Sequence, residues 1–138
     1  MSFESVIQKA IFETLKNNAA IIANGAPVYD DVPQANDSGA PQVFPYIVVG
    51  DDSLVPWDTD TEIGVDGALT IHTWSRYAGK KELKELQGLI YDALHRQDLV
   101  IAGYNSAVCV LQVSNNFLDA DGKTRHGIQT FTMLIEKL

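Results

Sequence analysis

The sequence predicts an α+β fold in which an antiparallel or mixed β-sheet of about four to five strands carries two amphipathic helices on one face. Three observations support this class. Two segments place apolar residues three and four positions apart, several others alternate apolar and polar residues, and most connections between them are short. A chain of 138 residues with 46% hydrophobic content is sufficient for one core. We therefore expect one domain over residues 1–138.

Helices are predicted at residues 3–18 and 80–96. The first begins after Ser2, a suitable N-cap, and Asn24-Gly25 and Pro27 break the chain beyond it. Lys81 and Glu85 are four residues apart and are expected to pair on the second helix. The apolar stripes are Phe3, Val6, Ile7, Ala10, Ile11 and Leu15 in the first helix, and Leu83, Leu86, Leu89, Ile90, Ala93 and Leu94 in the second.

Strands are predicted at residues 28–29, 46–50, 65–75, 107–118 and 124–136. Along the third of these, Leu69, Ile71 and Thr73 share one face, and Thr70, His72 and Trp74 share the other. The last two strands form a hairpin, and Asp119 to Gly122 supply its turn.

Two long connections flank the strand at 46–50. Residues 30–45 contain Pro33, Gly39, Pro41 and Pro45, which break regular structure, so this segment is expected to be a loop. Residues 51–64 are expected to be the next connection. Because they flank the same strand, we expect both loops to project from one end of the sheet and to meet a partner there.

The charge balance argues against tight binding to polyanions. The chain has 18 acidic and 10 basic residues, which gives a formal net charge of -8. Nucleic acids and anionic lipids are held mainly by Lys and Arg, so neither is an expected ligand. No apolar run approaches the roughly 18–20 residues that cross a bilayer, and the charged N-terminus is not typical of a secretory signal. Cys109 is the one cysteine, which suits a reducing compartment.

The usual catalytic and metal motifs are missing from the sequence. It has no G-x-S-x-G, H-E-x-x-H, C-x-x-C or G-x-x-x-x-G-K-[ST] pattern. His72 on its strand is either a base or ligand, or a half-buried residue bonded to a neighbour, and the second interpretation is favoured. His126, near the hairpin turn, is expected to be solvated. We therefore predict no cofactor and no catalytic residue.

An acidic stretch that lacks basic residues is the feature that most needs an explanation. It comprises Asp51, Asp52, Asp58, Asp60 and Glu62. A catalytic pair, a metal site and a surface for another molecule are all possible explanations. A standard calcium loop does not fit, because Ile63 stands where glycine is required and Leu69 where glutamate is required. Weak divalent binding at Asp51, Asp58, Asp60 and Glu62 stays open.

Trp57 lies within this acidic stretch and has two interpretations. Its ring either folds back over the edge of the sheet, or stays exposed as an anchor for a partner, since Trp is enriched at binding hot spots. Acids around an exposed anchor can pair with Lys or Arg of a neighbour and discourage premature aggregation.

Three segments taken together resemble a known family. They are YDDVPQ (29–34), FPYIVVGDD (44–52) and IHTWSRYAGKKELKELQGLIYDAL (71–94). In order and spacing they are similar to the tail completion or tail terminator proteins of long-tailed bacteriophages and related gene-transfer particles. The resemblance extends from the first helix to the final hairpin. It implies a structural virion protein, not an enzyme, which stops polymerisation of the tail tube at its head-proximal end and joins it to the head. A head–tail adaptor or stopper, or another minor tail protein, is the alternative.

The resemblance also implies partners and a location. Copies of the chain are expected to form a ring, typically a hexamer, that contacts the tail tube protein and the head–tail connector. The virion tail, assembled in the cytoplasm of a bacterial host, is the expected location, without a membrane. Genome DNA is expected to pass through without specific binding, since an acidic or neutral wall does not hold phosphates. The residues expected at subunit or partner contacts are Trp57, Asp58, Asp60, Asp51, Asp52, Val32 and Phe44, with Trp57 as the anchor.

Overall fold

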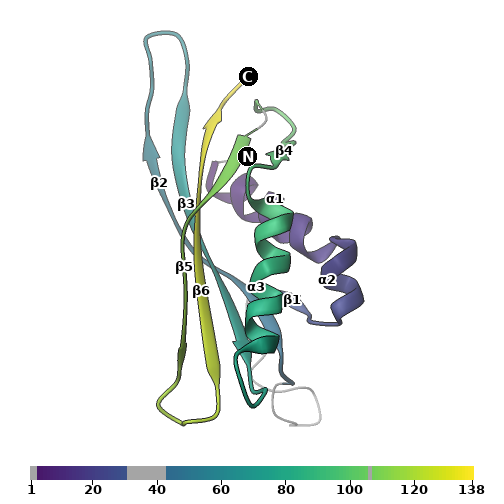
Figure 1. Cartoon of the computed structure of the whole chain (residues 1–138). Coiled ribbons are helices and arrows are strands. Elements are labelled where there is room, and N and C mark those ends of the chain that lie inside the picture. The colour runs from purple at the N-terminus through teal and green to yellow at the C-terminus, as the bar shows by residue number, and fades with distance from the viewer. Residues whose placement is uncertain (1–2, 31–42, 106) are drawn as a thin grey trace, which may run out of the picture.

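The fold is a two-layer arrangement of helices on one face of a curled sheet (Figure 1). The computed structural model describes residues 3–30, 43–105 and 107–138. The helices are α1 (Phe3–Lys16), α2 (Ala19–Asn24) and α3 (Lys81–Leu94). The α+β class and the placement of helices on one face are confirmed, and α2 is a third helix that the sequence analysis did not predict.

The sheet has six strands in the order β1-β2-β3-β6-β5-β4. They are β1 (Val28–Tyr29), β2 (Tyr46–Pro56), β3 (Gly64–Ser75), β4 (Asp98–Leu99), β5 (Ala107–Leu118) and β6 (Arg125–Glu136). Only β1 and β2 pair in parallel, and the other neighbours are antiparallel. The sheet is therefore mixed, with more strands than the four to five expected.

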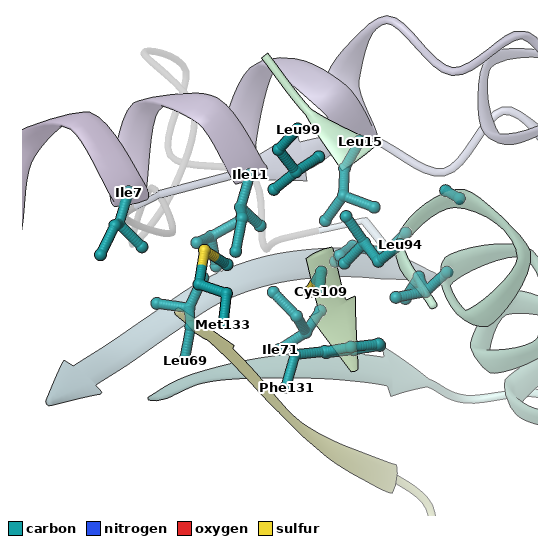
Figure 2. Packing of buried hydrophobic residues seen from close by; sticks show 14 of the residues in the cluster. Ile7, Ile11, Leu15, Leu69, Ile71, Leu94, Leu99, Cys109, Phe131 and Met133 are labelled. Atoms are coloured by element: carbon teal, nitrogen blue, oxygen red, sulfur yellow. The ribbon is translucent and has the colours of Figure 1, made fainter. Parts of the chain in front are cut away.

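The core lies between α1, α3 and the central strands. Ile7, Ile11 and Leu15 are fully buried along one side of α1, and Figure 2 shows them facing the side chains of β3 and β6. Phe131 and Ile71 are equally buried on those strands. The apolar side of α1 therefore packs against the buried side chains of the sheet, as the spacing of its apolar residues predicts.

Helix α3 covers the other half of the same face. Leu83, Leu86 and Ile90 are buried, and Lys81 Nζ lies 4.0 Å from Glu85 Oε1 on the exposed side. The helix ends at Leu94, two residues before the predicted end. Arg96 has a φ of 59°, a left-handed conformation that a helix does not continue through.

Strand β2 is much longer than predicted. The predicted end at Gly50 and the expected loop at Asp51 and Asp52 are wrong, because the strand continues to Pro56. Its pairing with β3 shifts register between Val49 and Asp52 and then resumes. After this bulge the backbone of β2 pairs with β3 again, and the acidic side chains of the strand are exposed.

The turn between β5 and β6 is held by one carboxylate. Asp121 Oδ1 accepts from the backbone N–H groups of Lys123 and Thr124, and Oδ2 accepts from Thr124 Oγ1 at 2.6 Å. These hydrogen bonds lower the pKa of Asp121 to about 2. The hairpin predicted from the alternation is confirmed, together with its turn. Within the described ranges, no helix is both long and apolar enough to cross a bilayer.

Candidate interaction surface

The β2–β3 hairpin extends beyond the helical layer at one end of the molecule (Figure 1). Its tip, residues 57–63, is a small hydrogen-bonded loop. The N–H of Trp57 donates to the carbonyl of Gly64 at 3.0 Å, and the N–H of Thr59 donates to that of Glu62 at 2.9 Å. Asp58 Oδ1 also accepts from the N–H of Gly64. The tip is therefore an ordered projection.

Trp57 packs on its own hairpin. Its side chain is half-buried, and a Cβ added at Gly64 would lie 2.6 Å from its Cε2 atom, so only glycine allows this approach. The indole Nε1 is covered and has no hydrogen-bond partner within the described part of the chain. Of the two interpretations of Trp57, the structure matches the one in which the ring folds back on the sheet. Its part in a subunit contact stays a prediction.

The acidic residues do not converge on one point. Asp58, Asp60 and Glu62 are exposed at the tip, whereas Asp51 and Asp52 are exposed farther down β2. Across residues 3–30, 43–105 and 107–138, no group of three or more His, Cys, Asp or Glu could hold a metal ion. Weak divalent binding at these acids thus gains no geometric support, since Asp58 already accepts a backbone hydrogen bond.

Phe44, which is also predicted at a partner contact, lies far from the tip. Phe44 precedes β2 and Trp57 follows it, and a strand of 11 residues spans roughly 33 Å. Arg76 lies over the Phe44 ring, with its Cζ atom 4.2 Å from the ring centroid. Val32 lies outside the described residues. The expectation that both connections project from one end of the sheet is wrong for Phe44 and Trp57, because connections that flank one extended strand leave from its opposite ends.

The face of the sheet away from the helices carries few charged side chains. Paired positions form rows across β2, β3, β6 and β5, and we call this surface the open face. One row is Val55, Asp66 and Leu134, with Val108 of β5 lining the same hollow as Leu134; the next is Ser53, Ala68, Thr132 and Val110; the row at the other end is Tyr46, Trp74, His126 and Phe117. Asp66 is the single charged residue in these three rows, and the alternation of β6 places Glu136 on the same face. The charged side chains of the molecule lie mostly elsewhere.

The last row is an aromatic cluster that the sequence analysis missed. The Trp74 and His126 rings are parallel, with centroids 3.7 Å apart, and Phe117 meets His126 edge-on. His72 Nδ1 lies 2.7 Å from His126 Nε2. The cross-strand pairing of β3 with β6 creates this contact between residues 54 positions apart, and no local sequence signal reveals it.

Both histidines favour the neutral form. Burial lowers the pKa of His72, although Asp51 opposes this, and burial together with His72 lowers the pKa of His126, with Asp119 opposing. The favoured interpretation of His72, a half-buried residue bonded to a neighbour, is confirmed. The expectation that His126 is solvated is wrong, because only 8% of it is exposed.

Comparisons with known proteins identify similar sequences and folds. A family model described as tail completion protein gp17 matches residues 9–136. Tail completion protein gp17 of Bacillus phage SPP1 is 28% identical over 123 residues, which are 88% of this chain and 86% of that protein. A chain in the virion of a native gene transfer agent particle has the same fold, with a TM-score of 0.85 and 22% identity over 98% of this chain and 99% of that chain. The structure of SPP1 gp17 matches with a TM-score of 0.56 and 24% identity, over 94% of this chain and 88% of that chain.

Proposed function

This chain belongs to the tail completion protein gp17 family, and from that membership we propose that it is a structural protein of a phage or gene-transfer-particle tail. Its proposed task is that of a tail terminator. Copies form a ring, typically of six, on the head-proximal end of the tail tube, stop its growth and present a surface to the head connector. The chain acts by binding and geometry, without turnover.

The family match over residues 9–136 is the observation that carries this proposal, because it includes almost the whole described fold. The relatives are named for tail completion and for a virion, and neither name describes an enzyme. A fold of the same kind, matched over 98% of this chain, occurs in a gene transfer agent virion. This supports a place in such a particle.

The surface of the molecule suits a conduit for DNA. The open face is largely Ser, Thr, Ala and Val in its middle rows, and the chain as a whole has a net charge of -8. Phosphates bind Lys and Arg, so a wall of this composition does not retain passing DNA. The proposed ring therefore guides the genome without specific binding.

The hairpin tip is the proposed contact with an axial partner, either tube or connector. It projects past the helices, and it carries Asp58, Asp60 and Glu62 on an ordered loop. Acids on a projecting loop repel other copies of the tip and attract a basic patch on a different protein. Trp57 gives this tip its shape by packing on Gly64.

Controlled assembly of tail tubes tests the proposed function. Purified tail tube protein is polymerised with and without the chain, and tube lengths are measured by electron microscopy. We expect the chain to cap one end of each tube and to stop elongation there, whereas an unrelated protein of similar charge leaves length unchanged. Binding to portal-bearing heads without binding to tube ends would contradict the terminator and favour the adaptor alternative.

A further inference from the structure

The sheet has one long strand near each edge, and each is covered along only half of its length. On the β2 side, β1 pairs with Ile47 and Val48 alone. On the β5 side, β4 pairs with Ala107 and Val108, and hydrogen bonds from residues 95–97 continue to Leu111. Among the described residues, nothing pairs with the outer edge of β2 over 51–56. Along residues 112–118 of β5, only the Gln87 side chain reaches the edge, donating to the carbonyl of Asn115.

The two uncovered segments lie diagonally across the sheet. Residues 51–56 lead to the β2–β3 tip at one end of the molecule, and residues 112–118 lead to the β5–β6 turn at the other (Figure 1). Unpaired strand edges template further pairing, and proteins normally cover or blunt them. The short strands β1 and β4 do this for one half of each edge, and no strand of the described residues covers the other half.

We infer that consecutive copies of this chain join by pairing residues 51–56 of β2 in one copy with residues 112–118 of β5 in the next. The inference rests on the proposed ring and names the surface that closes it. Strand direction permits the contact. Because β2, β3, β6 and β5 alternate in direction, β2 and β5 are antiparallel. A neighbour that continues the sheet with its helices on the same side therefore presents β2 antiparallel to β5.

Charge favours this heterologous pairing over pairing of identical edges. Residues 112–118 contain no charged side chain, whereas Asp51 and Asp52 lie on the open half of β2. Two β2 edges side by side would bring four carboxylates together, and β2 beside β5 does not. Both segments contain an exposed apolar side chain: Val55 is 62% exposed and Phe117 is 46% exposed. Pairing would remove part of this apolar surface from water.

A head-to-tail contact of this kind generates a ring when it closes. Because the open halves are diagonal, each copy is displaced along the strand direction relative to the last. In a closed β-barrel, the stagger between neighbouring strands determines how far the strands tilt from the barrel axis. A ring closed by this staggered contact therefore requires strands that are inclined to the ring axis. The open face and the helical layer would form the two opposite surfaces of this ring.

Disulfide cross-linking between copies tests the inference directly. Ser53 on β2 is combined in turn with Val113, Asn115 or Phe117 on β5, each replaced by Cys; all four side chains belong to the open face. Cys109 does not interfere, since it is buried and burial raises its pKa to about 12. After mild oxidation, we expect at least one pair to give a ladder of covalent oligomers up to the ring number on non-reducing denaturing gels.

The controls separate this inference from the proposed function. Ser53→Cys combined with Gly88→Cys on the exposed side of α3 should give no ladder. Rings of correct mass with no ladder from any of the three pairs would overturn the edge pairing and leave the terminator function standing. Covalent dimers of Asn115→Cys alone, formed within rings of the correct mass, would also overturn it, because they would place two copies of position 115 in contact inside one ring. If the chain forms no ring even with tail tube protein, both the function and the inference fail.

Discussion

At the residue scale, the histidine pair shows how one contact depends on several strands. His72 on β3 and His126 on β6 approach to 2.7 Å through the pairing of their strands, and Gly50 on β2 lies directly against the His72 ring. A Cβ at Gly50 would lie 2.6 Å from His72 Cδ2 and 2.9 Å from the carbonyl oxygen of Thr70. A side chain at position 50 would therefore require the His72 ring or the β3 backbone to shift.

Gly50→Ala should lower the free energy of unfolding by about 1–3 kcal/mol, the usual cost of overpacking. The added methyl group must displace the His72 ring or the β3 backbone. Urea unfolding measures the loss. Gly88→Ala is the control, because a Cβ at Gly88 meets no atom within 4 Å. Gly122→Ala is unsuitable, because Gly122 has a φ of 70° and an alanine there would strain the backbone. Equal stability of Gly50→Ala and the native chain would refute the close approach.

Stability should fall as the pH falls below about 7. Both histidines have folded pKa values below the ordinary 6.5, so the unfolded chain binds more protons than the folded chain in this window. Their contribution is complete above pH 6.5 and is lost as the pH falls toward the lowered folded values. Urea midpoints at pH 7.5 and 5.5 measure it. The His72→Gln, His126→Gln double variant should lose less stability over this range; an unchanged pH dependence would contradict the neutral pair.

At the element scale, helices and strands with a regular apolar pattern could be predicted, whereas a very short helix and a strand interrupted by acidic residues could not. Helix α3 and the β5–β6 hairpin follow directly from spacing and alternation. Helix α2 has only six residues and is set by the Asn18 cap, whose Oδ1 accepts from the N–H groups of Ala20 and Ile21. Such a short segment has no readable period. The continuation of β2 through Asp51 and Asp52 depends on pairing with β3, since acids are poor strand formers on their own.

The same limit explains the candidate surface. That the acidic stretch lies at the surface could be predicted from its composition, and the residues bear this out. The packing of Trp57 on Gly64 depends on a turn geometry that composition does not reveal. The open sheet edges could not be predicted either, because they depend on which strands are neighbours in the folded sheet.

Leu86→Ala should lower the free energy of unfolding by about 2–5 kcal/mol, because Leu86 is fully buried and the change leaves a cavity between α3 and the sheet. Gly88→Ala, two residues along the same helix, should raise stability by roughly 0.5–1 kcal/mol, because it is exposed and alanine favours a helix. Chemical denaturation of both variants tests the packing of α3. Similar stabilities for the two would show that α3 does not cover the core as described.

Trp57→Ala should loosen the hairpin tip while leaving the global fold in place. Trp57 packs on Gly64 and is absent from the buried cluster formed by α1, α3 and the central strands. Amide hydrogen exchange should accelerate at residues 57–64, and the urea midpoint should change less than in Leu86→Ala. We also expect weaker ring formation or partner binding. Global unfolding of the variant would instead make Trp57 part of the core.

At the scale of the whole molecule, the charge is distributed unevenly over the surface. An acidic tip projects at one end, α1 and α3 carry nine further charged residues, and Asp66 and Glu136 are the charged residues that β3 and β6 place on the open face. A subunit with a net charge of -8 associates with copies of itself most easily through surfaces that lack charge. The edge pairing inferred above uses such a surface on β5, and it leaves the acidic tip available for a different protein.

The mass of the chain in solution, measured over a range of concentrations with and without tail tube protein, tests the central claim most directly. A subunit of 15.1 kDa that works as a terminator should appear as a closed ring with a mass near six times that value, either alone or when tube ends are supplied. A mass of 15.1 kDa at every concentration, unchanged by tail tube protein, would contradict the account.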